Sequence, residues 1–257
     1  MGSAMLQSWE DLPYILSVDV LDPHTKQQNS SFTHIHSNIN ALQESKSDKN
    51  WDAIILAVKP QILEDVCKQI APLITEQQLI ISIAAGKTLA TIEGYFSYKQ
   101  PLIRCMPNTP AAIGKGMCVA FANHNAATSH KNLTSDLLTP LGQLVWLEQE
   151  NLMDPVTALS GSGPAYVFHM IESLTKAGEH IGLDTQTAST LARQTVIGSA
   201  ALAEAESDIS PEQLRINVTS PGGTTEAALN VVMDGRMQEL WNEALSAATK
   251  RAKELNN

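Results

Sequence analysis

The stretch WDAIILAVKP, residues 51–60, decides the fold class. Residues 51–58 form a nearly continuous apolar run that stops at Lys59-Pro60. A short apolar run with such an end is typical of a strand buried on both faces of a parallel sheet. The polar segment 61–74 follows, and apolar residues recur there at helical spacing: Ile62, Leu63, Val66 and Ile70. Strand followed by helix predicts an α/β fold.

Similar apolar runs lie on both sides of this stretch and predict further strands. They occupy residues 15–21, 79–85, 102–106, 117–121 and 144–147. We therefore expect a doubly wound, Rossmann-like parallel sheet over residues 1–151. From residue 152 to 257 the pattern predicts only helices, with starts at Pro164, Asp184, Ser210-Pro211, Thr224 and Met237.

Composition narrows the class of protein. The 257 residues are 43% hydrophobic and carry a formal net charge of -10, which argues against nucleic acid or an anionic membrane as a main partner. No run of about 18 apolar residues predicts a membrane span. The three cysteines form no C-x-x-C pair, so we expect no disulfide framework, no zinc cage and a reducing cytoplasm. Five of the seven histidines, His36 among them, lie in polar stretches and are expected to be solvated, and we predict no metal site.

The glycine-rich turn of a dinucleotide-binding fold is not found in the sequence. Gly2 is the only glycine in the first 85 residues, so no G-x-G-x-x-G motif is possible there. One interpretation is that residues 1–5 are an expression scar and the domain is of another kind. The other is that MGSAML is the first turn of the first helix, with the glycine loop and first strand lost upstream. In that case we expect the natural protein to be longer.

The strongest chemical motif is TSPGGTT, residues 219–225. Two glycines allow a tight turn, and a helix begins directly after them. The free N–H groups of Gly223, Thr224 and Thr225 would then point at one spot, which predicts a carboxylate site. The alternative is a plain helix N-cap, which Ser, Thr and Gly also favour.

Three further segments have the composition of binding loops. LSGSGPAY, 159–166, runs into a helix, and its alternative is a flexible domain connection. AVKP, 57–60, ends a strand at the edge where α/β sheets bind ligands; Lys59 could face phosphate or simply be solvated. RCMPNTP, 104–110, fixes Asn108 between two prolines, and its alternative is a rigid turn.

Five motifs in order, AVKPQ, SIAAGK, RCMPNTP, ALSGSGPAY and TSPGGTTEAAL, resemble the pyrroline-5-carboxylate reductase family over nearly the whole chain. The resemblance implies a Rossmann-like domain, incomplete at its amino end, followed by an all-helical domain (152–257) that binds substrate and forms a homodimer or larger homo-oligomer. The family's first motif would end at MGSAM, which favours the interpretation that an upstream part is lost.

The resemblance also implies site residues. Those expected to bind the nicotinamide cofactor, NADPH or NADH, are Asn38, Ala57, Val58, Lys59, Pro60, Ala84, Ala85, Gly86, Asn108 and Thr109. Those expected to hold the substrate carboxylate and ring are Gly222, Gly223, Thr224 and Thr225.

The implied reaction is hydride transfer from the cofactor to a cyclic imine, pyrroline-5-carboxylate, giving L-proline. Such an imine is readily protonated, so the protein mainly places the reactants, and Thr225 is the candidate to hydrogen-bond the ring nitrogen. Asp22 would favour NADH, whereas Lys26 could compensate, so the preferred cofactor stays open.

Two rival functions remain. A β-hydroxyacid dehydrogenase would need a catalytic lysine followed by asparagine on the first long helix, where this chain has Lys176-Ala177-Gly178. A truncated or degenerate paralogue without activity would keep the fold and lose the chemistry.

Overall fold

The computed structural model describes residues 1–25, 30–45, 51–97 and 99–255. The chain divides into two compact units, which are described separately. The first comprises residues 1–161 together with the end of the chain from Ala248, and the second comprises residues 162–247. Residues 152–161 and the last turns of the chain thus pack with the first unit, whereas the sequence-based division placed them after its boundary at residue 151.

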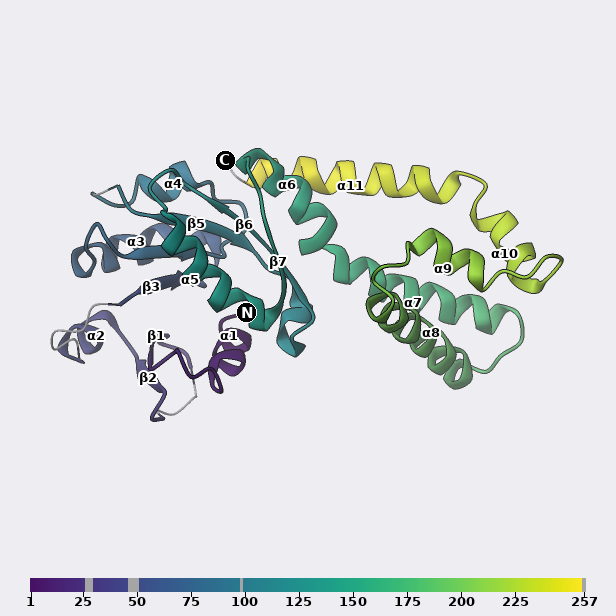
Figure 1. Cartoon of the computed structure of the whole chain (residues 1–257), viewed down its shortest axis with the longest axis horizontal. Helices are drawn as coiled ribbons and strands as arrows, with labels where there is room; N and C mark the ends of the chain where they lie inside the picture. Colours follow the sequence, from purple (N-terminus) through teal and green to yellow (C-terminus); the bar gives the residue numbers. More distant parts are fainter. Residues whose placement is uncertain (26–29, 46–50, 98, 256–257) are drawn as a thin grey trace. The chain divides into compact units, whose positions relative to one another are not determined.

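The first unit contains all the described strands, in two sheets (Figure 1). The smaller is a parallel pair, β1 (Val18–Leu21) and β2 (Thr33–His36). The larger has five strands in the order β3 (Ala53–Leu56), β4 (Leu79–Ser82), β5 (Leu102–Met106), β6 (Gly116–Ala122) and β7 (Gly142–Trp146). The α-helices of this unit are α1 (Gly2–Trp9), α2 (Ile39–Ser45), α3 (Leu63–Ile70), α4 (Leu89–Glu93), α5 (Thr128–Leu138) and α6 (Met153–Val156). Shorter 3-10 turns follow β3, α3, β5, α5 and β7, and a π-helical turn (Thr157–Gly161) follows α6.

Helices cover both faces of the larger sheet, as expected for a doubly wound fold. One face packs α1 and α5 against β4, β5 and β6 through Met5, Leu138, Ile81 and Ile103. The opposite face packs α3 and α4 against β3, β4 and β5 through a second cluster that includes Cys67, Ile92, Ile80 and Leu102. Neighbouring residues of one strand point to opposite faces, so β4 supplies Ile80 to one core and Ile81 to the other.

Strand directions depart from the prediction at one point. β3, β4 and β5 are parallel, but β6 runs antiparallel to β5, and β7 is parallel to β6. The segment joining β5 to β6 contains little more than one 3-10 turn, Thr109–Ile113. A parallel connection needs a crossover of about a dozen or more residues, so this short link reverses the chain.

The paired strands β1 and β2 form no ladder with β3 among the described residues. In a doubly wound sheet a central first strand lies at this position. The apolar pattern of the sequence did not predict β2, because its sequence THIH is short and polar.

His36 is buried, against the expectation that it is solvated. Its Nε2 lies 2.9 Å from Asp19 Oδ1, and Trp51 Nε1 donates to Asp19 Oδ2 at 2.9 Å. Burial raises the pKa of Asp19, but the two hydrogen bonds together with electrostatic attraction to His36 and His34 outweigh burial, so the net shift of the pKa is downward.

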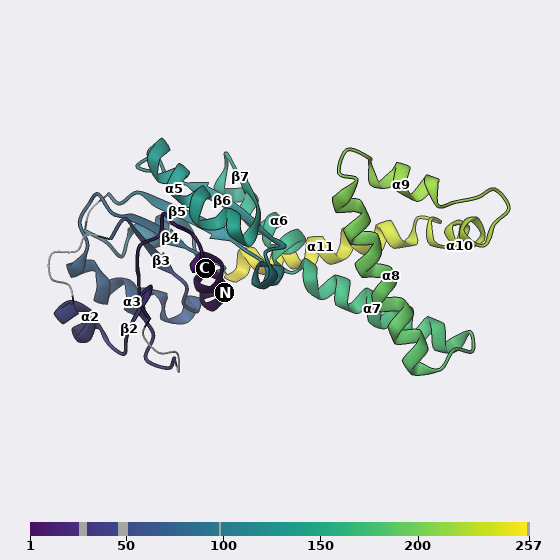
Figure 2. The same ribbon diagram turned by 60° about the horizontal axis from the view of Figure 1, so that its bottom comes forward.

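The second unit is entirely helical, as predicted. It contains α7 (Gly163–His180), α8 (Thr185–Ala205), α9 (Pro211–Asn217), α10 (Thr224–Val232) and the first part of α11 (Arg236–Leu255). Helices α7 and α8 pack against each other (Figure 2). The predicted helix starts at Asp184 and Ser210 are N-caps: Asp184 accepts a hydrogen bond from Thr187 N at 3.0 Å, and Ser210 Oγ accepts one from Gln213 N at 3.2 Å.

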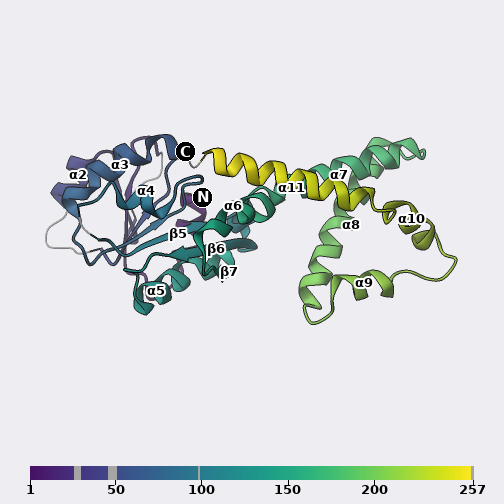
Figure 3. The ribbon, with the colours of Figure 1, turned by 90° about the horizontal axis from the view of Figure 1, so that it is seen from above.

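Helix α11 is one continuous element, seen in yellow in Figure 3, that starts in the second unit and ends in the first. Within the described part of the chain, no helix combines the length and the apolar character needed to cross a membrane.

Candidate active site

Three loops follow neighbouring parallel strands and therefore meet at one edge of the larger sheet. Leu56 at the end of β3 pairs with Ser82 at the end of β4, and Ser82 pairs with Arg104 on β5. The segments after these strands contain nine of the ten predicted cofactor residues, from Ala57 to Thr109. The edge beyond the carboxyl ends of parallel strands is where open α/β sheets bind ligands.

The loop after β3 is open to solvent. Ala57 and Lys59 are exposed, and Val58 and Pro60 are partly buried. A side-chain carbon added at Gly2 would lie 3.8 Å from Ala57 Cβ, so the first turn of α1 starts beside this loop. The amino end of a helix favours negative charge, and Lys59 adds a cation nearby. Both features suit a phosphate group.

The tenth residue, Asn38, lies between β2 and α2 and acts as a helix cap. Its Oδ1 accepts a hydrogen bond from Ala41 N at 3.0 Å, and its Nδ2 donates to Ser37 Oγ at 3.2 Å. The side chain is exposed, so it is accessible, but its oxygen already serves α2.

The loop between β4 and α4 contains Ala84, Ala85 and Gly86. Ala85 is exposed while its two neighbours are buried. Gly86 has φ +69, a left-handed conformation that favours glycine, and Leu255 at the end of α11 packs against it. Of the three residues, Ala85 is therefore the one that a flat ring could approach directly in this structure.

Both polar atoms of the Asn108 side-chain amide form hydrogen bonds within the protein. Its Nδ2 donates to the Ser160 carbonyl at 3.1 Å, and its Oδ1 accepts from Met117 N at 2.8 Å. Asn108 therefore ties the loop after β5 to β6 and to the SGSG segment. The sequence predicted that both segments are binding loops, but it did not predict the contact between them. Thr109, the next residue, is exposed.

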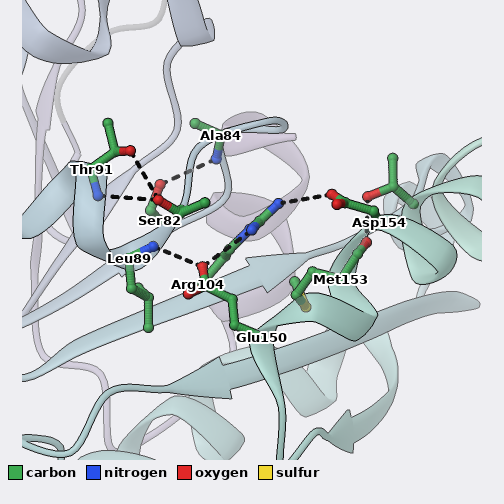
Figure 4. A network of polar contacts seen from close by, with 10 residues as sticks. Ser82, Ala84, Leu89, Thr91, Arg104, Glu150, Met153 and Asp154 are labelled. Carbon is green, nitrogen blue, oxygen red and sulfur yellow. Dashed lines mark hydrogen bonds and ion pairs between the residues drawn. The ribbon is translucent and has the colours of Figure 1, made fainter. Parts of the chain in front are cut away.

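A buried ion-pair network at this edge was missed by sequence reasoning (Figure 4). Arg104, 4% exposed, donates from Nη1 to Glu150 Oε1 at 3.2 Å, and its Nη2 lies 4.0 Å from Asp154 Oδ1. The available signal was an arginine inside the apolar strand LIRCM, because a buried charge is nearly always paired.

The TSPGGTT motif forms a tight turn that leads into α10, as predicted. Gly222 has φ +70, Gly223 is the N-cap, and Thr224 and Thr225 are the first helical residues. The Gly222 N–H donates to Glu226 Oε2 at 2.7 Å. The turn therefore binds a carboxylate supplied by the chain itself, but through Gly222. The Gly223 N–H, which the sequence predicted to be free, donates to the Ser220 carbonyl at 3.0 Å because the tight turn closes on itself.

The donor set of the first unit fits a nicotinamide dinucleotide. Small residues line the loop after β4. The loop after β3 contains Lys59 and lies beside the amino end of α1, and both loops belong to one sheet edge. Sequence reasoning found no glycine-rich phosphate loop in this chain, and α1 begins at Gly2.

Comparisons with known proteins agree with this architecture. Residues 150–255 match the family model for pyrroline-5-carboxylate reductase dimerisation, and residues 1–86 match the model for NADP oxidoreductase, coenzyme F420-dependent. The pyrroline-5-carboxylate reductase of Pseudomonas aeruginosa is 41% identical over 221 residues, which is 86% of this chain and 78% of that protein.

The chain is also similar to solved structures of this family over its whole length. The pyrroline-5-carboxylate reductase of Coxiella burnetii has a TM-score of 0.90 at 34% identity, covering 100% of this chain and 95% of that one. The Plasmodium falciparum pyrroline carboxylate reductase with NADP bound has a TM-score of 0.81 at 29% identity, with the same coverage. With this identity, this coverage and this order of motifs, the chain belongs to the pyrroline-5-carboxylate reductase family.

Proposed function

We propose that the protein reduces pyrroline-5-carboxylate to L-proline with NADPH or NADH. The observation that carries the proposal is the TSPGGTT turn, whose Gly222 N–H already binds a carboxylate at 2.7 Å. The substrate has a carboxylate beside its ring, and the turn offers the matching donors. Relatives with 35–41% identity carry this activity in their names.

The cofactor side of the proposal rests on the sheet edge of the first unit. A reduced nicotinamide supplies the hydride when the cofactor is bound. Ala57–Pro60 would contact the phosphate and ribose part, Ala84, Ala85 and Gly86 the nicotinamide ring, and Thr109 the same end. Asn108 would act mainly by fixing the loop, because its amide is already bonded to Ser160 and Met117. Asn38 stays a proposal for the adenosine end.

On the substrate side, Gly222 and Thr224 would hold the carboxylate through backbone N–H groups, while Gly223, whose N–H donates to the Ser220 carbonyl at 3.0 Å, would shape the turn. Thr225 is half-buried in the first turn of α10, and its hydroxyl would hydrogen-bond the ring nitrogen. Substrate binding requires Glu226 to leave the Gly222 N–H, since two carboxylates at one donor repel each other. The contribution of the protein to the reaction rate would then come mainly from holding the imine and the cofactor in position.

The dimerisation model matched by residues 150–255 supports self-association, and we propose a homodimer or larger homo-oligomer. Within residues 162–247 only Ala188 and Ala192 are buried, while apolar side chains of α7 such as Val167 and Leu174 remain over 40% exposed. A partner copy would cover this surface. The three described cysteines are free thiols, which suits the cytoplasm.

The test is cofactor oxidation followed at 340 nm with pyrroline-5-carboxylate, using NADPH and NADH in parallel, and with a β-hydroxyacid as the rival substrate. Thr225→Ala is the matched variant. Turnover of the β-hydroxyacid would support a dehydrogenase instead. No turnover of either substrate, in a sample that is folded and binds cofactor, would support a paralogue without activity.

A further inference from the structure

Glu150 is at the centre of the buried network because one of its oxygens serves two donors. Oε1 accepts from Arg104 Nη1 at 3.2 Å and from the backbone N–H of Leu89 at 2.7 Å (Figure 4). Arg104 also faces Asp154, whose Oδ1 is 4.0 Å from Nη2. The guanidinium of Arg104 therefore orients the Glu150 carboxylate, which lies in the segment after β7.

Leu89 is the first residue of α4, so Glu150 holds the amino end of that helix. Thr88 caps the same end, with its Oγ1 accepting from Thr91 N at 3.2 Å. A carboxylate at a helix amino end is also favoured by the helix dipole, and a charge-assisted bond to a backbone N–H is stronger than a neutral one. The bond from Leu89 is short and largely shielded, because Leu89 is 3% exposed.

The loop between β4 and α4 is thereby fixed at both ends. At its start, Ile83 N donates to Leu56 O at 3.2 Å and Ala84 N lies 3.4 Å from Ser82 Oγ. At its end stand Thr88 and the Glu150 bond. Between them lie Ala84, Ala85 and Gly86, the residues that would approach the nicotinamide ring.

We propose that Glu150, oriented by Arg104, is a positioning residue for the nicotinamide-binding loop 83–88; this rests on the proposed function. Glu150 touches neither cofactor nor substrate in this role. It opens the segment matched by the dimerisation model, and the loop belongs to the part matched by the oxidoreductase model through residue 86. The hydrogen bond between Glu150 and Leu89 thus links the start of the region matched by the dimerisation model to the end of loop 83–88.

Three variants of Glu150 separate the roles of its charge, its length and its oxygen. Glu150→Ala removes both bonds. Glu150→Gln keeps an oxygen for Leu89 N–H and Arg104 and serves as the conservative rescue. Glu150→Asp keeps the charge beside Arg104 but is too short to reach both donors. Asp184→Ala is the matched control, because it also removes a carboxylate from a backbone N–H at a helix start, in the second unit.

The first measurement is hydrogen–deuterium exchange without cofactor or substrate. We expect the amides of 84–89 to exchange at least tenfold faster in Glu150→Ala and Glu150→Asp, and within about threefold of the parent in Glu150→Gln, since a tenfold change corresponds to about 1.4 kcal/mol. Asp184→Ala should leave them unchanged. Unchanged exchange in Glu150→Ala, or an equal rise in Asp184→Ala, would overturn the proposal. If Glu150→Ala does not fold, Glu150→Asp decides in the same way.

The second measurement is the dissociation constant of NADPH from fluorescence titration, alongside KM and kcat. A positioning role predicts about tenfold weaker NADPH binding in Glu150→Ala, rescue in Glu150→Gln, and an unchanged KM for pyrroline-5-carboxylate. Equal binding in all variants would contradict it. A parent protein that binds NADPH but does not reduce the imine would refute the proposed function, while the exchange data would still decide the role of Glu150.

Discussion

Replacing Gly86 by alanine should destabilise the protein more than the same change at two glycines with the same backbone conformation. Gly86, Gly114 and Gly222 have φ of 69°, 68° and 70°. Each Gly→Ala change therefore incurs a similar conformational cost of about 1–2 kcal/mol. The positions differ in the space around the new carbon.

At Gly86 that carbon would lie 3.1 Å from the Leu255 carbonyl oxygen and 3.2 Å from Leu255 Cβ. At Gly114 the nearest atom is Pro140 O at 3.6 Å, and at Gly222 nothing lies within 4 Å. Overpacking costs typically about 1–3 kcal/mol, so Gly86→Ala should lose at least about 1 kcal/mol more than the other two. For a chain of this size that corresponds to an extra Tm decrease of about 2–4 °C.

The assay is thermal unfolding of the three variants at one protein concentration, because self-association makes Tm concentration-dependent. A second set of samples should end at Glu254. Without Leu255, Gly86→Ala should fall into line with Gly114→Ala. Equal Tm decreases for all three full-length variants would refute the reasoning and would mean that the end of α11 moves aside at no cost.

Four further outcomes are expected. Thr225→Ala should lower kcat about tenfold or more with NADPH affinity nearly intact, as loss of a hydrogen bond of about 1–2 kcal/mol predicts; steady-state kinetics that match the parent would leave only backbone groups in that role. Light scattering at micromolar concentration should give a dimer or larger species, and a monomer would count against the proposed assembly. Cys67 should resist alkylation at pH 8 in the native protein and react in denaturant, because burial raises the pKa of its thiol to about 12; labelling at Cys67 in native conditions, located by mass spectrometry, would contradict its burial. Finally, a version with a glycine-rich loop and strand placed upstream of Met1 should bind NADPH at least a hundredfold more tightly than this chain, because two or three charge-assisted hydrogen bonds contribute about 1.5–3 kcal/mol each. Equal affinities in calorimetric titration would mean that other residues hold the phosphates.

Strong apolar patterns predicted most of the fold. The runs around β3, β4 and β5 lie within a residue or a few of the observed strands, because strands buried on both faces require continuous apolar sequence. Strand β2 was missed because THIH is stabilised by pairing with β1 and by the His36–Asp19 contact, neither of which leaves a local pattern. The reversed direction of β6 depends on the length of one connection and not on its own sequence.

The site was predictable in outline, and its internal bonds were not. Proximity of the three loops follows from strand order, which the strand–helix alternation implies. The contact of Asn108 with Ser160 joins residues 52 positions apart, and the contact of Glu150 with Leu89 joins residues 61 apart. Such pairs depend on tertiary packing, so a single sequence gives no spacing from which to infer them. Glu226 was likewise overlooked as a ligand of its own turn.

The packing of Leu255 on Gly86 has a practical consequence for preparing the protein. A purification tag, reporter or immobilisation handle that replaces the residues after Leu255 would start next to the loop expected to meet the nicotinamide ring. Crowding there could be mistaken for weak cofactor affinity. Conversely, a small environment-sensitive dye attached at position 255 would sit close enough to report on that loop without a new cysteine in either core.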